Sequence, residues 1–335
     1  MDKYIKKQEI IWYPWLSNPY RQIISGYLNN KKNYSMLINT KIGLGTDILI
    51  KKISQRLFCM NPNNLKSCFS CHACQLILKS NHPDFYKIQC GKYINKIDIN
   101  NLRNIISHLY YSSYQNRKII WIKNIEFLTI ESMTLLLKVL EEPKKNIIFL
   151  LSTHNKNKIL KTIQSRCICI SIDSPKKETL ILWLKKYTSQ LSNNELEIIS
   201  NLHINNPKLA FNLIHIENWI KRKKFFYLLR NSLINKNLLL WLSEFNQNNI
   251  SIKLYWLITI LIDVLKNKMK IENFIINTDQ LDLINQLNLL HSNDMLFEII
   301  KEWNIYYFRL KSKININKKI QLVSQLINWQ EKIFN

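Results

Sequence analysis

The sequence lacks any apolar run long enough to cross a membrane. Its longest such run, Leu254–Leu265, contains Asp263, whereas a spanning helix needs roughly 20 apolar residues. The first residues, MDKYIKKQEIIWYPWL, contain no apolar signal core, so we do not expect export to an oxidising compartment. We therefore expect a soluble, cytoplasmic protein whose 7 cysteines serve as metal ligands or core residues.

Small and acidic residues are also scarce. The chain has only 4 glycines in 335 residues, Ala73 and Ala210 are its only alanines, and 48 Lys and Arg face 23 Asp and Glu, a net charge of +25. Such a surplus is typical of proteins with an acidic partner such as nucleic acid. Drift toward AT-rich codons, which would explain the heavy use of Ile, Asn and Lys, accounts for it equally well. Charge alone therefore assigns no function.

Apolar residues make up 47% of the chain, enough for folded cores. In the first half, runs typical of strands occur at 36–38, 85–88, 118–122, 147–152 and 167–172. Apolar residues recur at helical spacing in 98–109 and 129–142, where Thr129 is a candidate N-cap and Pro143 ends the helix. Strands that alternate with helices predict an α/β domain with a parallel sheet covered on both faces.

The character of the chain changes after about Pro175. Residues 179–187, 194–202 and 207–214 have the periodicity of three short amphipathic helices, and from about residue 215 the pattern is helical almost throughout. We predict an α/β domain at 1–172, a small helical domain at 173–214 and an all-α domain at 215–335.

Four cysteines crowd into a short segment, which predicts a metal site. Cys59, Cys68, Cys71 and Cys74 include two overlapping CxxC steps. Thiolates this close in sequence can surround one Zn²⁺ ion, and four protein ligands leave no open position for water or substrate. The spacing thus predicts a structural zinc module at 59–74, although disulfides or core cysteines remain the alternative.

A loop with two glycines resembles a degenerate phosphate-binding loop. Laid onto the pattern G-x-x-x-x-G-K-[ST], Gly45 takes the second glycine, while Thr40 stands at the first glycine, Thr46 at the lysine and Asp47 at the Ser/Thr; Gly43 lies between. Thr46 cannot supply the positive charge that holds the β- and γ-phosphates, and Asp47 would place a carboxylate near them. An ordinary strand–turn–helix connection would give the same pattern.

The strand at 118–122 lacks the acidic end that hydrolysis needs. It is followed by Lys123 and Asn124, where carboxylates would hold magnesium and activate water, and Glu126 comes two residues late. Since both halves of the hydrolytic site are missing, we predict a descendant of an ATPase that does not turn over nucleotide.

Arg166 lies between a predicted helix and a predicted edge strand. From such a position a guanidinium can reach a γ-phosphate held by another subunit, as arginine fingers do. A surface arginine paired with a carboxylate is the alternative.

In their order and spacing, these segments resemble the clamp-loader branch of the AAA+ ATPases. The resemblance is dense over residues 12–172 and weaker beyond. It is carried by Trp12–Leu16, the four-cysteine spacing, His82–Tyr86, Leu136–Pro143, Phe149–Thr153 and Ser165–Cys167.

The resemblance implies a RecA-like (AAA+) domain with a zinc-binding insertion, a three-helix lid and a helical collar for oligomerisation. It implies a non-hydrolysing stator subunit within the DNA polymerase III holoenzyme, with Arg166 acting in trans at a site where a neighbour binds ATP. The implied partners are motor subunits of gamma/tau type, a delta-type subunit, and, through the complex, a sliding clamp and primed DNA. Residues 205–210 carry no arginine where motor subunits sense nucleotide; Lys208 is the nearest basic residue.

Two other functions remain open at the level of sequence. One is an ATPase motor subunit with an atypical site, which would need a replacement for the missing lysine. The other is a zinc-stabilised nucleic-acid-binding protein that uses basic stretches such as 221–224 and 311–319.

Overall fold

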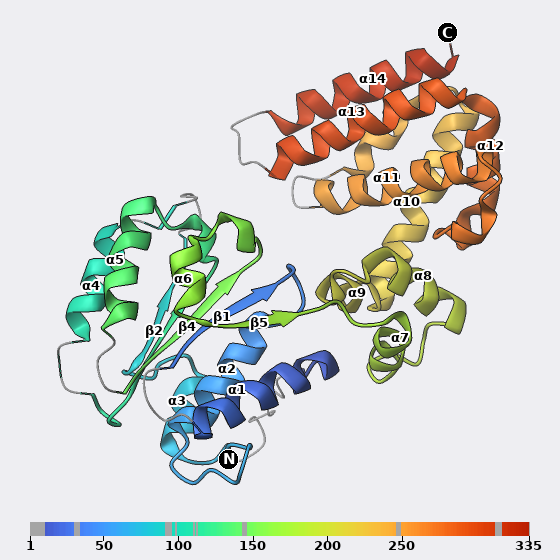
Figure 1. Ribbon diagram of the computed structural model, residues 1–335. Coiled ribbons are helices and arrows are strands. Elements are labelled where there is room, and N and C mark those ends of the chain that lie inside the picture. The colour runs from blue at the N-terminus through green and yellow to red at the C-terminus, as the bar shows by residue number, and fades with distance from the viewer. Residues whose placement is uncertain are drawn as a thin grey trace, which may run out of the picture. The chain divides into compact units, whose positions relative to one another are not determined.

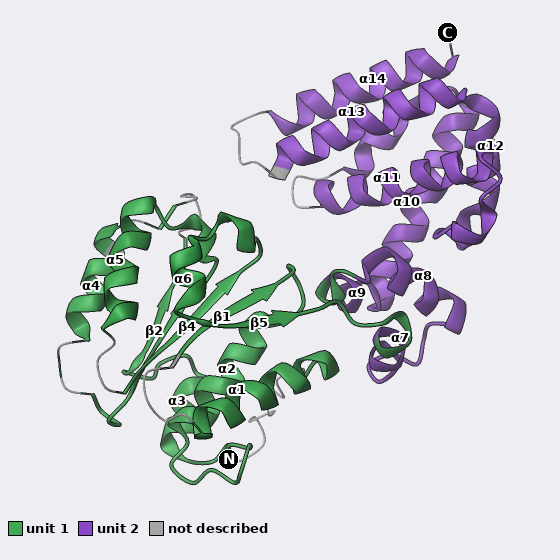
Figure 2. Cartoon of the chain, in the orientation of Figure 1, with its two compact units in different colours: residues 1–179, 205–208 green, residues 180–204, 209–335 purple. Residues whose placement is uncertain are grey.

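The computed structural model describes residues 11–29, 34–90, 96–97, 99–109, 111, 113–142, 146–245, 249–311 and 317–334. The chain forms two compact units (Figure 2). The first comprises residues 1–179 and 205–208, and the second comprises residues 180–204 and 209–335. The predicted division into three domains is finer than these two units and stays a prediction.

The first unit is built on a five-stranded parallel sheet, in agreement with the predicted α/β architecture. The strand order is β2-β3-β4-β1-β5, and every pairing is parallel. The strands are β1 (Tyr34–Thr40), β2 (Phe85–Ile88), β3 (Lys118–Ile122), β4 (Ile147–Thr153) and β5 (Ile168–Ile172). The central strands β3 and β4 are buried along their whole length, which explains their unbroken apolar sequences.

Helices cover both faces of this sheet (Figure 1). One group is α1 (Ser17–Asn29), α2 (Thr46–Phe58) and α3 (His72–Leu78), and the other is α4 (Ile99–His108), α5 (Ile130–Glu141) and α6 (Lys161–Ser165). Leu136 and Leu140 of α5 and Ile163 of α6 pack in one core cluster with β3 and β4. Thr129 caps α5 as predicted, because its side chain accepts a hydrogen bond from Ser132 N–H at 3.2 Å. Pro143 lies outside the described residues.

Short 3₁₀ segments connect the main elements of both units. They are η1 (Pro14–Leu16), η2 (Ile125–Phe127), η3 (Lys156–Lys158), η4 (Leu238–Glu244), η5 (Glu272–Phe274) and η6 (Thr278–Gln280).

The second unit is entirely helical where the structure describes it, as its periodicity predicts. It begins within α7 (Lys177–Lys185) and continues with α8 (Asn193–His203), α9 (Pro207–Leu213), α10 (Ile216–Ile234), α11 (Ile250–Lys268), α12 (Leu281–Leu290), α13 (Asn293–Lys311) and α14 (Lys318–Phe334). Its core contains large aromatic side chains, and two of its buried tryptophans donate hydrogen bonds through their indole N–H groups. Trp241 Nε1 donates to Phe225 O, and Trp329 Nε1 donates to His291 Nε2, each at 3.0 Å.

A buried polar network ties α10 to α11 and to the segment before α12. Arg222 is fully buried, and it donates to Asp279 Oδ2 and to Asn277 Oδ1 at 2.6 Å each. Asp263, also fully buried, accepts from Asn277 N and Nδ2 at 2.8 Å. Buried charges are tolerated only when they are paired in this way.

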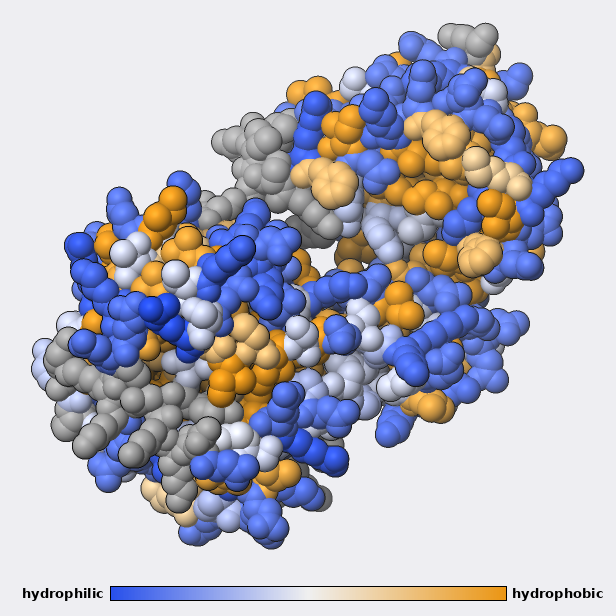
Figure 3. Space-filling view, viewed as in Figure 1, coloured by the Kyte–Doolittle hydropathy of each residue, from blue (hydrophilic) through white to orange (hydrophobic). Residues whose placement is uncertain are grey.

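Among the described residues, no helix is both long and apolar enough to cross a membrane. On the face shown in Figure 3, hydrophilic side chains cover much of both units, and apolar patches interrupt them.

The Arg222 network predicts a large difference between two aspartates. Asp279→Ala leaves the buried Arg222 charge without its carboxylate, so we expect the free energy of unfolding to fall by about 3–5 kcal/mol. The matched control is Asp282→Ala, because Asp282 is 86% exposed and lies 3.6 Å from Arg230; here the expected loss is at most about 1 kcal/mol. Denaturant titration followed by circular dichroism measures both, and equal losses would contradict the assignment.

Candidate functional site

The degenerate phosphate-binding loop follows β1 at the carboxyl edge of the sheet and leads into α2. Gly43 and Gly45 have φ of 90° and 92°, in the left-handed region that glycine tolerates. The loop is packed against the chain's own side chains. A Cβ at Gly43 would lie 1.8 Å from Asn206 Oδ1, and one at Gly45 would lie 2.4 Å from Tyr13.

The segment Asn205–Lys208 belongs to the same unit and is bonded to this loop. Lys208 N–H donates to Gly43 O at 3.3 Å. Asn205 Oδ1 accepts from Lys41 Nζ at 3.0 Å and from Ser174 Oγ at 2.9 Å. These hydrogen bonds hold the segment Asn205–Lys208 against the loop.

Asp47 and Lys123, two of the residues that the sequence singled out, form an ion pair. Lys123 Nζ lies 2.7 Å from Asp47 Oδ2, which joins the first turn of α2 to the end of β3. Compared with a hydrolytic site, the charges are reversed: the loop side carries a carboxylate and the strand side an ammonium group. Asn124 follows in a left-handed conformation, with φ of 56°.

The one carboxylate near the end of β3 is engaged in holding the backbone. Glu126 Oε1 accepts from His154 N–H at 3.0 Å, and His154 Nδ1 lies 2.8 Å from Thr40 O. These contacts connect the ends of β4 and β1. They direct Glu126 Oε1 to a backbone amide instead of a water or a metal ion.

Arg166 follows α6 and precedes β5, so it lies at the amino edge of the sheet. Since β5 is parallel to β1, with Met36 beside Ile168 and Thr40 beside Ile172, the length of β5, about 13 Å, separates the Arg166 backbone from the level at which the phosphate-binding loop begins. The Arg166 guanidinium is 2.8 Å from Glu141 Oε1, and the side chain is 37% exposed. In this chain alone, therefore, Arg166 does pair with a carboxylate.

The neighbours of Arg166 serve to anchor it. Ser165 Oγ and Arg166 Nη1 both donate to Thr162 O at 3.0 Å. Burial raises the pKa of the Cys167 thiol to about 12, and the nearby Cys169 adds to this, so Cys167 stays neutral while it packs against the core.

The four predicted metal ligands come together. Cys59 follows α2, Cys71 caps α3 and Cys74 lies within α3. The Sγ atoms of these three residues and of Cys68 all lie within 4.8 Å of one another, so the cluster could hold a metal ion. All seven cysteines are free in this structure, and His72 is not part of the cluster.

Backbone amides around the cluster favour thiolates. Cys68 N–H donates to Cys59 Sγ at 3.2 Å, and Cys71 N–H donates to Cys68 Sγ at 3.3 Å. The Cys71 amide is the main cause that lowers the pKa of Cys68 to about 6, whereas burial raises the pKa of Cys59 and of Cys74. The loop itself is fastened to the helices, since Tyr20 Oη donates to Leu65 O at 2.5 Å and Arg117 Nη1 donates to Leu57 O at 2.6 Å.

The basic side chains at 221–224 are less available for binding phosphate groups than the sequence suggests. Arg222 is buried, Lys223 Nζ is 2.7 Å from Glu195 Oε1, and Lys224 Nζ is 3.7 Å from Glu244 Oε1. These pairings argue against a phosphate-binding stripe there. The other run, 311–319, lies partly outside the described residues.

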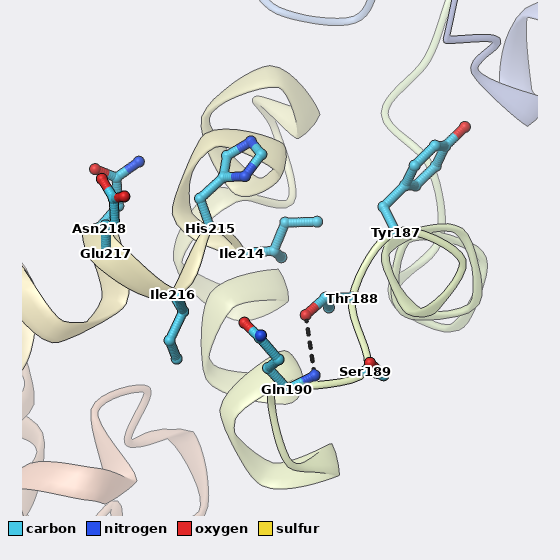
Figure 4. A pocket seen from close by; sticks show the side chains of 9 residues that line it. All are labelled: Tyr187, Thr188, Ser189, Gln190, Ile214, His215, Ile216, Glu217 and Asn218. Carbon is cyan, nitrogen blue, oxygen red and sulfur yellow. Dashed lines mark hydrogen bonds between the residues drawn. The ribbon is translucent and has the colours of Figure 1, made fainter.

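A groove in the second unit contains none of the predicted site residues (Figure 4). It lies between the α7–α8 connection and the start of α10, and Tyr187, Gln190 and His215 are among its lining residues. Within it, Gln190 N–H donates to Thr188 Oγ1 at 3.3 Å.

Sequence reasoning missed three partners of the predicted residues. It did not pair Asp47 with Lys123, place Asn206 against Gly43, or place Glu141 beside Arg166. The reversal of charge between Asp47 and Lys123 was visible in the sequence and would have been the signal for the first pairing.

Comparison with known proteins agrees with the clamp-loader resemblance. Residues 16–176 match the family model described as DNA polymerase III, delta subunit, and residues 217–331 match the model for its C terminal part. The chain is 33% identical to DNA polymerase III subunit delta' of Buchnera aphidicola subsp. Schizaphis graminum, over 96% of this chain and 97% of that protein. It is 31% identical to the Yersinia pestis subunit of the same name, over 95% of each.

A third relative is DNA polymerase III subunit gamma of the same Buchnera strain, at 29% identity over 58% of this chain and 54% of that protein. The sheet order, the clustered cysteines and the two full-length relatives lead to one conclusion: the chain belongs to the DNA polymerase III subunit delta' family, within the clamp-loader group that its motifs resemble.

Proposed function

We propose that this chain is the non-hydrolysing stator of a bacterial sliding-clamp loader, and that it contributes Arg166 in trans to the ATP site of an adjacent motor subunit. The observation that carries this proposal is the position of Arg166 on the sheet. It precedes β5 at the amino edge, whereas the chain's own nucleotide loop follows β1 at the carboxyl edge. An arginine so placed is directed away from its own pocket, and it serves a neighbour's.

The chain's own pocket supports the same role. A motor needs a lysine on the phosphate loop and carboxylates after β3; here the Lys123–Asp47 ion pair reverses these charges, and Asn206 packs on Gly43. We infer that the subunit has no intrinsic ATPase activity. The relation to a gamma subunit supports motor partners of gamma/tau type. A delta-type subunit, a sliding clamp and primed DNA complete the proposed assembly, in the bacterial cytoplasm.

We further propose that the helical second unit supplies the lid and the collar through which the subunits associate. Apolar side chains on α13 support an interface there, since Phe297 and Phe308 are 51% and 65% exposed.

Zinc is the metal that we propose for the cysteine cluster. A tetrahedral ion with Zn–S bonds of about 2.3 Å has S–S edges of about 3.8 Å, which the Sγ atoms, all within 4.8 Å of one another, come close to. Four thiolates fill the shell, so the ion would stabilise the 59–74 module and take no part in catalysis.

Substitution of Arg166 tests the central proposal. In the complex reconstituted with its motor subunit, Arg166→Ala should lower ATP turnover at the adjoining site on the order of 10³-fold while subunit assembly stays intact. The control is Arg21→Ala, because Arg21 is exposed on α1, in the group of helices that does not include α6. Phosphate release at saturating ATP is the measurement. Unchanged turnover with Arg166→Ala would remove the arginine-finger role.

A restored lysine should not create a motor. In Thr46→Lys, Lys123 and Asn124 still cannot hold magnesium, and Asp47 still pairs with Lys123. We therefore expect no ATP hydrolysis by this variant alone, measured as phosphate release with the motor subunit as positive control. Measurable hydrolysis by the single variant would contradict the account of the pocket.

The metal assignment predicts one zinc ion per chain by elemental analysis. Cys71→Ser should lower the zinc content and make the 59–74 segment more sensitive to limited proteolysis. Cys169→Ser is the matched control, because Cys169 is an exposed cysteine outside the cluster, and it should retain zinc. A metal-free unmutated protein would defeat the premise.

A further inference from the structure

The backbone that precedes Arg166 is held in place by buried side chains and hydrogen bonds. Ile163 of α6 is fully buried and Ile159 nearly so. Gln164 Nε2 donates to Lys156 O at 3.1 Å and to Ile159 O at 3.0 Å, which fastens the turn before α6. The backbone at Arg166 therefore has little freedom. The guanidinium can change position mainly through rotation about the bonds of its own long side chain.

Two contacts restrict that side chain. Nη1 donates to Thr162 O at 3.0 Å, and Nη2 lies 2.8 Å from Glu141 Oε1. Thr162 belongs to α6, the short helix that Arg166 directly follows, so this contact ties the guanidinium only to its own local segment. Glu141 belongs to a different helix, α5, which packs through Leu136 and Leu140 in the same core cluster as Ile163.

Glu141 occupies a position that does not favour a carboxylate on local grounds. It is the last residue of α5, and negative charge at a helix C-terminus opposes the helix dipole. Helix stability therefore does not explain the acid there. Its pairing with Arg166 does, since the ion pair offsets this cost and links two helices next to the finger.

We propose that Glu141 is a positioning residue for Arg166. It holds the guanidinium in one orientation before a neighbour's nucleotide arrives, so that less side-chain freedom is lost on engagement. More than a third of the Arg166 side chain stays exposed while both contacts are in place, so the group remains open to a phosphate. This inference rests on the proposed role of Arg166 in trans.

The test uses the reconstituted complex with its motor subunit. Glu141→Gln keeps the size of the side chain and removes its charge. We expect turnover at saturating ATP to fall about twofold to fivefold, the range for loss of a partly exposed ion pair, with the KM for ATP and subunit assembly unchanged. Glu142→Gln is the matched control, because it makes the same charge change at an exposed neighbouring position and should have no effect. Glu141→Asp, which keeps the charge, should recover part of the rate.

A double-mutant cycle separates positioning from a general structural role. If Glu141 acts through Arg166, Glu141→Gln has no further effect in an Arg166→Ala background. Equal effects of Glu141→Gln with and without Arg166, equal effects of Glu141→Gln and Glu142→Gln, or a faster rate with Glu141→Gln would each overturn the inference while the role of Arg166 stands. No effect of Arg166→Ala by itself would instead remove the proposed function.

Discussion

The parallel pairing of β1 with β5 is the constraint on which the functional arrangement depends. It sets the nucleotide loop and Arg166 at opposite edges of one sheet, so that no small loop movement brings them together. Both groups are held by the fold: β1 is paired on both sides, with β4 and β5, and α6 is anchored through the buried Ile163. In the proposed function, a subunit built in this way has its own pocket on one edge and, on the other edge, a group for a neighbour's pocket.

Charged and backbone groups of the degenerate nucleotide pocket contact other residues of this chain. The Lys123–Asp47 ion pair is partly exposed on both sides, so its contribution to stability is at most about 1 kcal/mol. Its consequence is chemical. The carboxylate on α2 and the ammonium after β3 neutralise each other, and Asn206 packs on the loop. This arrangement suits the proposed non-hydrolysing subunit, since the ammonium group that could attract a phosphate is already paired with a carboxylate.

Much of the fold was predictable because its signals are local. The unbroken apolar runs of β3 and β4 reflect burial on both faces, and Thr129 and the periodicity after it located α5. The clustering of the cysteines was predictable because Cys68, Cys71 and Cys74 lie at three-residue intervals. The partners of the site residues were not predictable from the sequence. Glu141 contacts Arg166, and Asn206 contacts Gly43, only because segments distant in the sequence pack together. The burial of Arg222 within the basic run at 221–224 was not predictable for the same reason, since it depends on pairing with Asp279.

The most direct test of the central claim is a structure of the assembled complex bound to a non-hydrolysable ATP analogue. The account predicts that the Arg166 guanidinium lies within hydrogen-bond distance of the γ-phosphate in the adjacent subunit, with no nucleotide at Gly43 and Gly45 of this chain. An analogue bound in this chain's own loop, or an Arg166 that remains far from every nucleotide, would contradict it.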